Sequence, residues 1–225
     1  MEFLRRQLDD TGARPCGICQ NCRPHDEPKL RTTTEAGAFL RQDDVLIEPR
    51  NLWPAGVEGP RLAVYGISAG RALCRWSDLE LSDLIRRGKY EDERFDDVLV
   101  EEVADLLARW NPAPFPEWVT AVPGRVGLVA DFAARLAQRL GLEFVESLRK
   151  LDDRPPQKHM TNSIWQARNV LGALAVNEVR TSPVLLVDDM VDSRWTLTSA
   201  GSTLRLAGVP IVYPCALADT SGAEA

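Results

Sequence analysis

The stretch that decides the fold runs from residue 184 to residue 196 and reads VLLVDDMVDSRWT. The four apolar residues at its start are typical of a buried strand in a parallel sheet. Two adjacent acids, Asp188 and Asp189, follow at the carboxyl end of that strand, and a short loop with Ser193 and Thr196 then opens a helix. Because ligands of open parallel sheets bind beyond the carboxyl ends of the strands, this stretch also indicates where a site lies.

The residue types in this stretch suit a phosphorylated sugar. Free backbone N–H groups and the positive dipole end of a helix start favour a phosphate, and the hydroxyls of Ser193 and Thr196 add donors. The carboxylates of Asp188 and Asp189 are acceptors for the vicinal hydroxyls of a ribose. A metal-binding or capping role for the two acids is the alternative. No G-x-G-x-x-G or Walker motif is present, which disfavours a dinucleotide fold or an ATP-driven motor.

Outside this stretch, residues 112–225 alternate between strand and helix patterns. Strands are predicted at 118–122, 183–187 and 209–217, and helices at 127–140 and 196–207. Strands that alternate with helices predict an α/β fold with a parallel sheet flanked by helices.

The region before it, residues 32–111, is mixed. Short strands bounded by Pro and Gly are predicted at 45–54 and 61–67, and a helix at 94–110. Three alternate prolines, at 112, 114 and 116, cannot continue that helix and predict a boundary. We therefore expect three parts: 1–31, a mixed linker or hood region at 32–111, and 112–225.

Composition limits the function classes. The chain has 225 residues, 44% hydrophobic and 27% charged, which is ordinary for a globular protein. The net charge of −6 disfavours a global electrostatic attraction to nucleic acid. No apolar stretch approaches the ~20 residues of a membrane helix, and the opening MEFLRRQLDD lacks the apolar core of a secretory signal. We expect a cytoplasmic protein with no membrane partner; its oligomeric state is left open.

Three of the five cysteines form a run near the start of the chain. Cys16, Cys19 and Cys22 are spaced C-x-x-C-x-x-C, which predicts a structural Zn²⁺ site. Structural zinc takes four ligands, so the fourth is either His25 or a residue further upstream. Cys74 and Cys215 lie among apolar residues and are expected to be buried as small hydrophobic side chains.

The stretch 184–196 resembles the phosphoribosyl-diphosphate (PRPP) motif of type I phosphoribosyltransferases. The resemblance implies that Asp188 and Asp189 hold the ribose hydroxyls and that residues 192–196 wrap the 5′-phosphate. In the hypoxanthine–guanine branch an acid at the position of Asp192 accepts a proton from the base, so Asp192 is the candidate catalytic residue. The same resemblance implies Mg²⁺, bridging oxygens of the ribose and the diphosphate.

The loop departs from the family pattern at two positions. Arg194 stands where the family has a glycine, and Trp195 replaces the next small or flexible residue. Glycine is favoured there because the backbone approaches the phosphate closely or takes a positive φ. Either Arg194 donates a charge-assisted bond to the phosphate, or the two side chains fill the site and abolish turnover.

Two further segments resemble the same family. Residues 122–125 read VPGR, a strand end followed by a tight turn, where the family holds the diphosphate; Pro123, Gly124 and Arg125 are the candidate ligands. Residues 149–168 carry five Lys or Arg and two acids, as in a hood loop that closes over the diphosphate and excludes water. This segment looks like the ComF branch and nominates Arg154, Gln157 and Lys158. A surface arginine and a solvated loop are the alternatives.

The opening FLRRQLDD and CGICQNC resemble the zinc module of RecQ helicases. Actinobacterial-type RecQ proteins with a phosphoribosyltransferase-like tail have the same order of parts, and the helicase motor itself is absent from these residues. Three functions remain open: a phosphoribosyltransferase acting on PRPP, a non-catalytic regulatory or scaffold module of such a helicase, and a zinc-dependent DNA-binding piece that meets DNA through the parent helicase.

Overall fold

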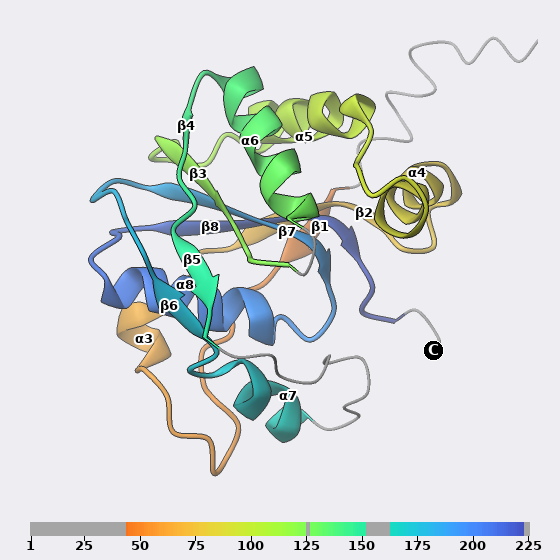
Figure 1. Ribbon diagram of the computed structural model, residues 1–225. Coiled ribbons are helices and arrows are strands. Elements are labelled where there is room, and N and C mark those ends of the chain that lie inside the picture. The colour runs from red at the N-terminus through yellow and green to blue at the C-terminus, as the bar shows by residue number, and fades with distance from the viewer. Residues whose placement is uncertain (1–43, 125–126, 152–162, 223–225) are drawn as a thin grey trace, which may run out of the picture. The chain divides into compact units, whose positions relative to one another are not determined.

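The computed structural model describes residues 44–124, 127–151 and 163–222, all within the unit Asp43–Ala225 (Figure 1). Seven predicted site residues lie outside the described ranges: Cys16, Cys19, Cys22, Arg125, Arg154, Gln157 and Lys158. The described elements are, in chain order, β1 (Val45–Ile47), α3 (Leu62–Tyr65), β2 (Gly70–Arg75), α4 (Leu79–Tyr90), α5 (Asp97–Trp110), β3 (Trp118–Ala121), α6 (Leu128–Leu140), β4 (Glu143–Phe144), β5 (Leu148–Lys150), α7 (Ser163–Val170), β6 (Leu174–Val176), β7 (Val184–Val191), α8 (Trp195–Leu206) and β8 (Val212–Asp219).

Within the described residues, six strands form one sheet in the order β1-β2-β8-β7-β3-β4. Strand β1 is antiparallel to β2, and every other neighbouring pair is parallel. Figure 1 shows α5 and α6 on one face of the sheet and α8 with α3 on the other. The predicted fold class, a parallel sheet flanked by helices, is confirmed.

The central strand β7 contributes side chains to two hydrophobic cores, one on each face of the sheet. Leu185 and Val187 pack with residues of α5 and α6, whereas Val184 and Leu186 pack with residues of α8. Successive side chains of a strand point to opposite faces, so the run of four apolar residues predicted as a buried strand serves both cores. Each fully buried Leu or Val contributes about 1.5–3 kcal/mol relative to exposure.

The ends of the helices follow local chemistry that the sequence displays. Helix α5 begins at Asp96, whose carboxylate accepts a hydrogen bond from the backbone N–H of Val98 at 2.9 Å. Helix α6 ends at Gly141, which takes φ +70° and donates its N–H to the carbonyl of Ala137. The predicted helix at 127–140 is therefore confirmed, with its predicted stop.

The prediction of a strand at 61–67 is wrong. Residues 62–65 form the short helix α3, which packs against α8, and the strand of this region is β2, at Gly70–Arg75. A short, mostly apolar run does not distinguish one helical turn from a strand, so its tertiary setting decides: Leu62 is buried and α3 contacts α8. The strand predicted at 45–54 is confirmed only for the three residues of β1.

Residues on both sides of position 112 contribute to the same sheet. Strands β1 and β2 precede this position, and β2 pairs directly with β8. Helix α5, which ends just before the prolines, packs against α6. The edge of the sheet that carries the candidate site is therefore built from both regions of the chain.

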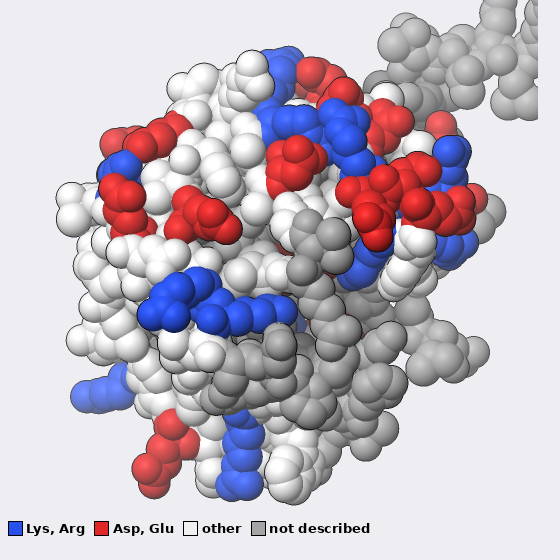
Figure 2. All heavy atoms as spheres, in the orientation of Figure 1, with Lys and Arg blue, Asp and Glu red and all other residues white. Residues whose placement is uncertain are grey.

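Cys74 and Cys215 are buried free thiols, as expected. Burial raises the pKa of each thiol to about 12, so both stay protonated at neutral pH. Within the described ranges, no helix is long and apolar enough to cross a membrane. On the face shown in Figure 2, acids and bases are interspersed around α4, α5 and α6, and a small group of basic side chains lies near β5 and β6.

Candidate functional site

The two adjacent acids lie in the last four residues of β7. Asp188 is 8% exposed and pairs across the sheet with Ala216 of β8. Asp189 is also largely covered, with 17% of its side chain exposed. The prediction ended the strand at Val187 with both acids directly after it, whereas β7 continues through them to Val191.

The carboxyl group of Asp188 is in an environment that opposes its ionisation. Burial raises its pKa well above the usual range, and the neighbouring charge of Asp189 raises it further. The backbone N–H of Asp189 donates to Asp188 Oδ1 at 2.9 Å and, with the charge of Lys89, acts in the opposite direction. Packing alone gives no reason to bury an acid, so a carboxyl group of this kind is typical of a functional site.

Asp189 forms an ion pair that the sequence did not predict. Lys89 Nζ of α4 lies 2.7 Å from Asp189 Oδ2 and donates to Met190 Sδ at 3.4 Å. Lys89 lies in a part of the chain, residues 77–105, in which eleven acids outnumber four bases. A single lysine in such a segment carries no signal that it meets a residue one hundred positions later.

The loop after β7 has the backbone shape for which the family uses glycine. Arg194 takes φ +68° and ψ −2°, the left-handed conformation that residues with a Cβ rarely adopt. Helix α8 begins directly afterwards at Trp195, so the backbone N–H groups of its first turn lie at this edge. Arg194 therefore takes a conformation that glycine adopts without the steric cost of a Cβ.

The side chain of Arg194 is directed to β1 and its continuation. Its Nη1 donates to the carbonyl oxygen of Glu48 at 3.3 Å and lies 3.7 Å from the carboxylate Oε2 of the same residue. A second guanidinium approaches the loop from the same segment, because Arg50 donates from Nη2 to the carbonyl oxygen of Ser193 at 2.9 Å. Two guanidinium groups therefore lie at the loop 192–196, together with the carboxylates of Glu48, Asp192 and Asp219.

The indole of Trp195 belongs to the core. It is 2% exposed and stacks on Trp53, with ring centroids 5.4 Å apart and an interplanar angle of 16°. Its Nε1 donates to Ser163 Oγ of α7 at 2.9 Å, and the guanidinium carbon of Arg50 lies 4.6 Å from its ring. The side chain thus anchors the start of α8 to the segment after β1 and to α7.

The loop after β3 lies beside the acids. Strands β3 and β7 are parallel neighbours, and the N–H of Val122 donates to the carbonyl oxygen of Val187 at 2.8 Å. Pro123 and Gly124 follow immediately, so this loop emerges next to Asp188 at the same edge of the sheet. Gly124 is exposed, and an added Cβ there would meet nothing within 4 Å.

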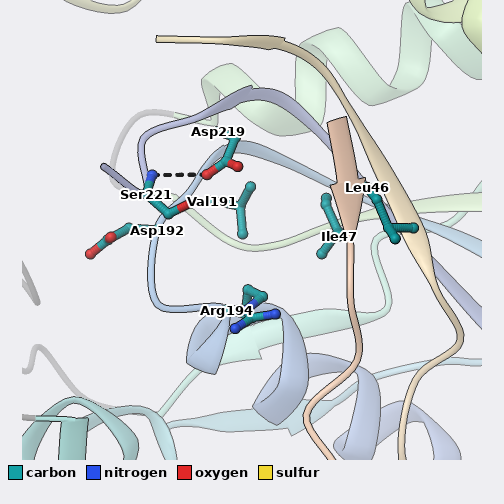
Figure 3. A pocket seen from close by; sticks show the side chains of 7 residues that line it. All are labelled: Leu46, Ile47, Val191, Asp192, Arg194, Asp219 and Ser221. Atoms are coloured by element: carbon teal, nitrogen blue, oxygen red, sulfur yellow. Dashed lines mark hydrogen bonds between the residues drawn. The ribbon is translucent and has the colours of Figure 1, made fainter. Parts of the chain in front are cut away.

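A small pocket of about 150 Å³ opens where β7 and β8 end (Figure 3). Figure 3 shows two lining residues from the loop after β7, Asp192 and Arg194. It also shows Asp219, which accepts a hydrogen bond from the N–H of Ser221. The lining residues are Leu46, Ile47, Val191, Asp192, Arg194, Asp219 and Ser221. Pockets for drug-sized ligands have about 300–1,000 Å³, so this one suits a single group of a larger ligand.

The structure brings the predicted residues of three segments together. Asp188 and Asp189, the loop 192–196, and Pro123 with Gly124 share one edge of the sheet. The predicted hood segment is described only at its two ends, β5 and α7. Sequence reasoning missed Lys89, Arg50 and Asp219, each of which reaches the site from another part of the chain.

The turn at Arg194 leads to a stability prediction. We expect Arg194→Gly to be more stable than Arg194→Ala by about 0.5–1 kcal/mol, because glycine takes a positive φ without the steric cost of a Cβ. Both variants lose the contacts to Glu48, so their difference isolates the backbone effect. Urea unfolding measures it, and an alanine variant as stable as the glycine variant would contradict a left-handed turn.

Comparison with known proteins yields only distant structural similarity. No family model matches the sequence, and no curated protein matches it. Among solved structures, the chain is similar to adenine phosphoribosyltransferase from Leishmania tarentolae, with 16% identity, 53% of this chain and 70% of that one covered, and a TM-score of 0.36. The enzyme of the same name from Leishmania donovani gives 11% identity, 81% and 78% coverage and a TM-score of 0.36. Similarity at this level assigns neither a substrate nor a site to this chain.

Proposed function

We propose that this edge of the sheet binds a ribose phosphate such as PRPP, and that the chain is phosphoribosyltransferase-like in function. The observation that carries the proposal is the buried acid Asp188, whose pKa is raised, beside a second acid in a strand that leads straight into the start of α8. Vicinal hydroxyls suit two adjacent carboxyl groups, and a phosphate suits a helix start flanked by two guanidinium groups.

The proposed ligand spans the three segments in one direction. The ribose lies over Asp188 and Asp189, its 5′-phosphate is held by the loop 192–196, and a diphosphate extends towards Pro123 and Gly124. Arg125 follows that turn in sequence and is the proposed cation for the diphosphate. Mg²⁺ prefers oxygen ligands and, in this proposal, is bound to oxygens of the ligand.

Transfer chemistry at this edge requires little from the protein beyond position and charge. The bond between ribose C1 and the diphosphate oxygen breaks, and a bond from C1 to the incoming nucleophile forms. The nucleophile's proton passes to Asp192, which is exposed and lines the pocket beside Arg194. The pocket's polar lining suits a nucleophile that carries hydrogen-bonding groups.

A non-catalytic binding module is the second candidate. It is favoured by Arg194, whose guanidinium lines the small pocket where an incoming group would enter. Attachment to a RecQ-type helicase and a Zn²⁺ site at Cys16, Cys19 and Cys22 are proposals that rest on sequence alone.

Titration calorimetry with PRPP and Mg²⁺ tests the proposal. We expect binding by the parent chain and a loss of affinity on the order of 100-fold when Asp188 and Asp189 are both replaced by alanine, because each acid accepts a hydrogen bond from the diol. Replacement of Glu91 and Asp92 by alanine is the matched control, since these are also adjacent acids but exposed in a turn. No heat from the parent chain would reject the proposal. Release of diphosphate with a panel of nucleobases separates transfer from binding alone.

A further inference from the structure

We propose that Lys89 is a positioning residue for the two ribose-binding acids, a role that rests on the function proposed above. Lys89 lies in α4, outside the region 112–225 in which the phosphoribosyltransferase resemblance was found. Its Nζ is 2.7 Å from Asp189 Oδ2, which is within hydrogen-bonding distance. The structure thus adds to the site a cation from a separate part of the chain.

The position of Lys89 is determined by close packing at the end of α4. A Cβ added at Gly88 would come within 2.9 Å of both the carbonyl oxygen of Arg94 and Cδ1 of Phe95. Phe95 is fully buried, so the last turn of α4 rests on a rigid surface that only glycine permits. This packing constrains the backbone of the last turn of α4, from which the side chain of Lys89 extends to Asp189.

The ion pair is shielded from solvent more than most surface pairs. The side chains of Lys89 and Asp189 are 26% and 17% exposed. By contrast, Arg86 and Asp83 pair on the same helix with 49% and 61% exposure. Exposed pairs contribute little because water and salt screen them, whereas a covered pair holds its charges and geometry.

The positive charge of Lys89 partly offsets the negative charge of the two acids. Among the described residues, Asp189 and Lys89 are the charged groups that act on Asp188, and its register partner on β8, Ala216, is uncharged. Burial and Asp189 raise the pKa of Asp188, and Lys89 lowers it. Without Lys89, Asp188 would retain its proton to a higher pH.

The pair leaves lone-pair positions on Asp189 for a ligand. A carboxylate offers about four lone-pair positions on two oxygens; Lys89 Nζ takes one of them on Oδ2, and the Asp188 side chain also contacts this carboxylate. The ammonium group therefore orients the carboxylate, and in this proposal the ribose hydroxyl takes one of the remaining positions. Both effects, orientation and charge, act through Asp189 rather than on the ligand itself.

The first test needs no ligand. The carboxyl ¹³C resonance of Asp188 is followed against pH in the parent chain and in Lys89→Met, Lys89→Arg and Arg86→Met. We expect the pKa of Asp188 to rise in Lys89→Met, to return towards the parent value in Lys89→Arg, and to stay unchanged in Arg86→Met. An unchanged titration in Lys89→Met would overturn the role of Lys89, whether or not any ligand binds.

The second test measures affinity for ribose 5-phosphate as a function of pH by calorimetry. Lys89→Met is expected to bind on the order of tenfold more weakly at pH 6 and to recover as pH rises, because Asp188 then ionises at a higher pH. Adding Lys89→Met to Asp189→Asn should have no further effect if Lys89 acts through Asp189. A loss in Lys89→Met that is independent of pH, or additive with Asp189→Asn, would overturn the inference. Failure of the parent chain to bind would count against the proposed function, while the titration still decides the role of Lys89.

Discussion

Asp188→Asn is expected to raise the stability of the folded chain at pH 8 while removing its affinity for a ribose phosphate. The asparagine keeps the shape of the side chain and an oxygen that accepts the N–H of Asp189, but it cannot ionise. Because an ionised carboxyl group in a buried setting is unfavourable, we expect a gain of about 1–2 kcal/mol at pH 8. Loss of an anionic acceptor for the diol should weaken binding on the order of 100-fold.

The pH dependence of this effect follows from linkage. The pKa of Asp188 is raised in the folded state, so the folded chain holds this proton more tightly than the unfolded chain does. The associated stability is fully present below the unfolded pKa of about 3.9 and is lost as pH rises through the folded pKa. The difference between Asp188→Asn and the parent chain should therefore be near zero at pH 3 and grow towards pH 8.

Urea unfolding at several pH values measures the stability difference, and calorimetry with ribose 5-phosphate measures affinity. Asp83→Asn on the surface of α4 is the control and should show neither effect, since Asp83 is 61% exposed. If Asp188→Asn instead destabilises the chain at pH 8, the prediction is wrong. The Asp188 side chain would then stabilise the fold, rather than being kept for function at a cost in stability.

Gly70→Ala is expected to destabilise the chain by about 3 kcal/mol or more, because there is no space for a methyl group at the start of β2. An added Cβ would overlap the carbonyl oxygen of Pro214 and lie 2.5 Å from its Cγ. Pro214 is in β8, next to the register pair of Arg71 and Cys215. Relief of the overlap would require β2 to move away from β8, which disrupts their pairing.

Gly124→Ala is the matched control for this substitution. Its added Cβ meets nothing within 4 Å, so the free energy of unfolding should change by no more than about 0.5–1 kcal/mol. Alanine also restricts the unfolded chain more than glycine does, which favours a small gain in stability. Thermal or urea unfolding compares the two variants. Equal stabilities would show that β2 and β8 are not as closely paired at Gly70 as the structure has them.

The sequence by itself determined the elements whose residues carry a strong local pattern. The apolar run before Asp188 predicted a central strand, because only a strand covered on both faces is apolar at successive positions. The spacing of Val129, Phe132 and Leu136 and the glycine at 141 predicted α6 and its end, since both signals lie within the helix itself. The same local pattern predicted Asp188 and Asp189 next to the carboxyl end of that strand, where the candidate site lies.

Only the tertiary structure decided which distant residues complete that edge. Lys89 meets Asp189 from one hundred residues away, and Arg50 meets Ser193 from 143 residues away. The same holds for 62–65, where packing against α8 selects a helix over the predicted strand. Spacing along the chain sets local conformation, but which surfaces meet depends on the packing of whole elements around the sheet, and no short pattern encodes it.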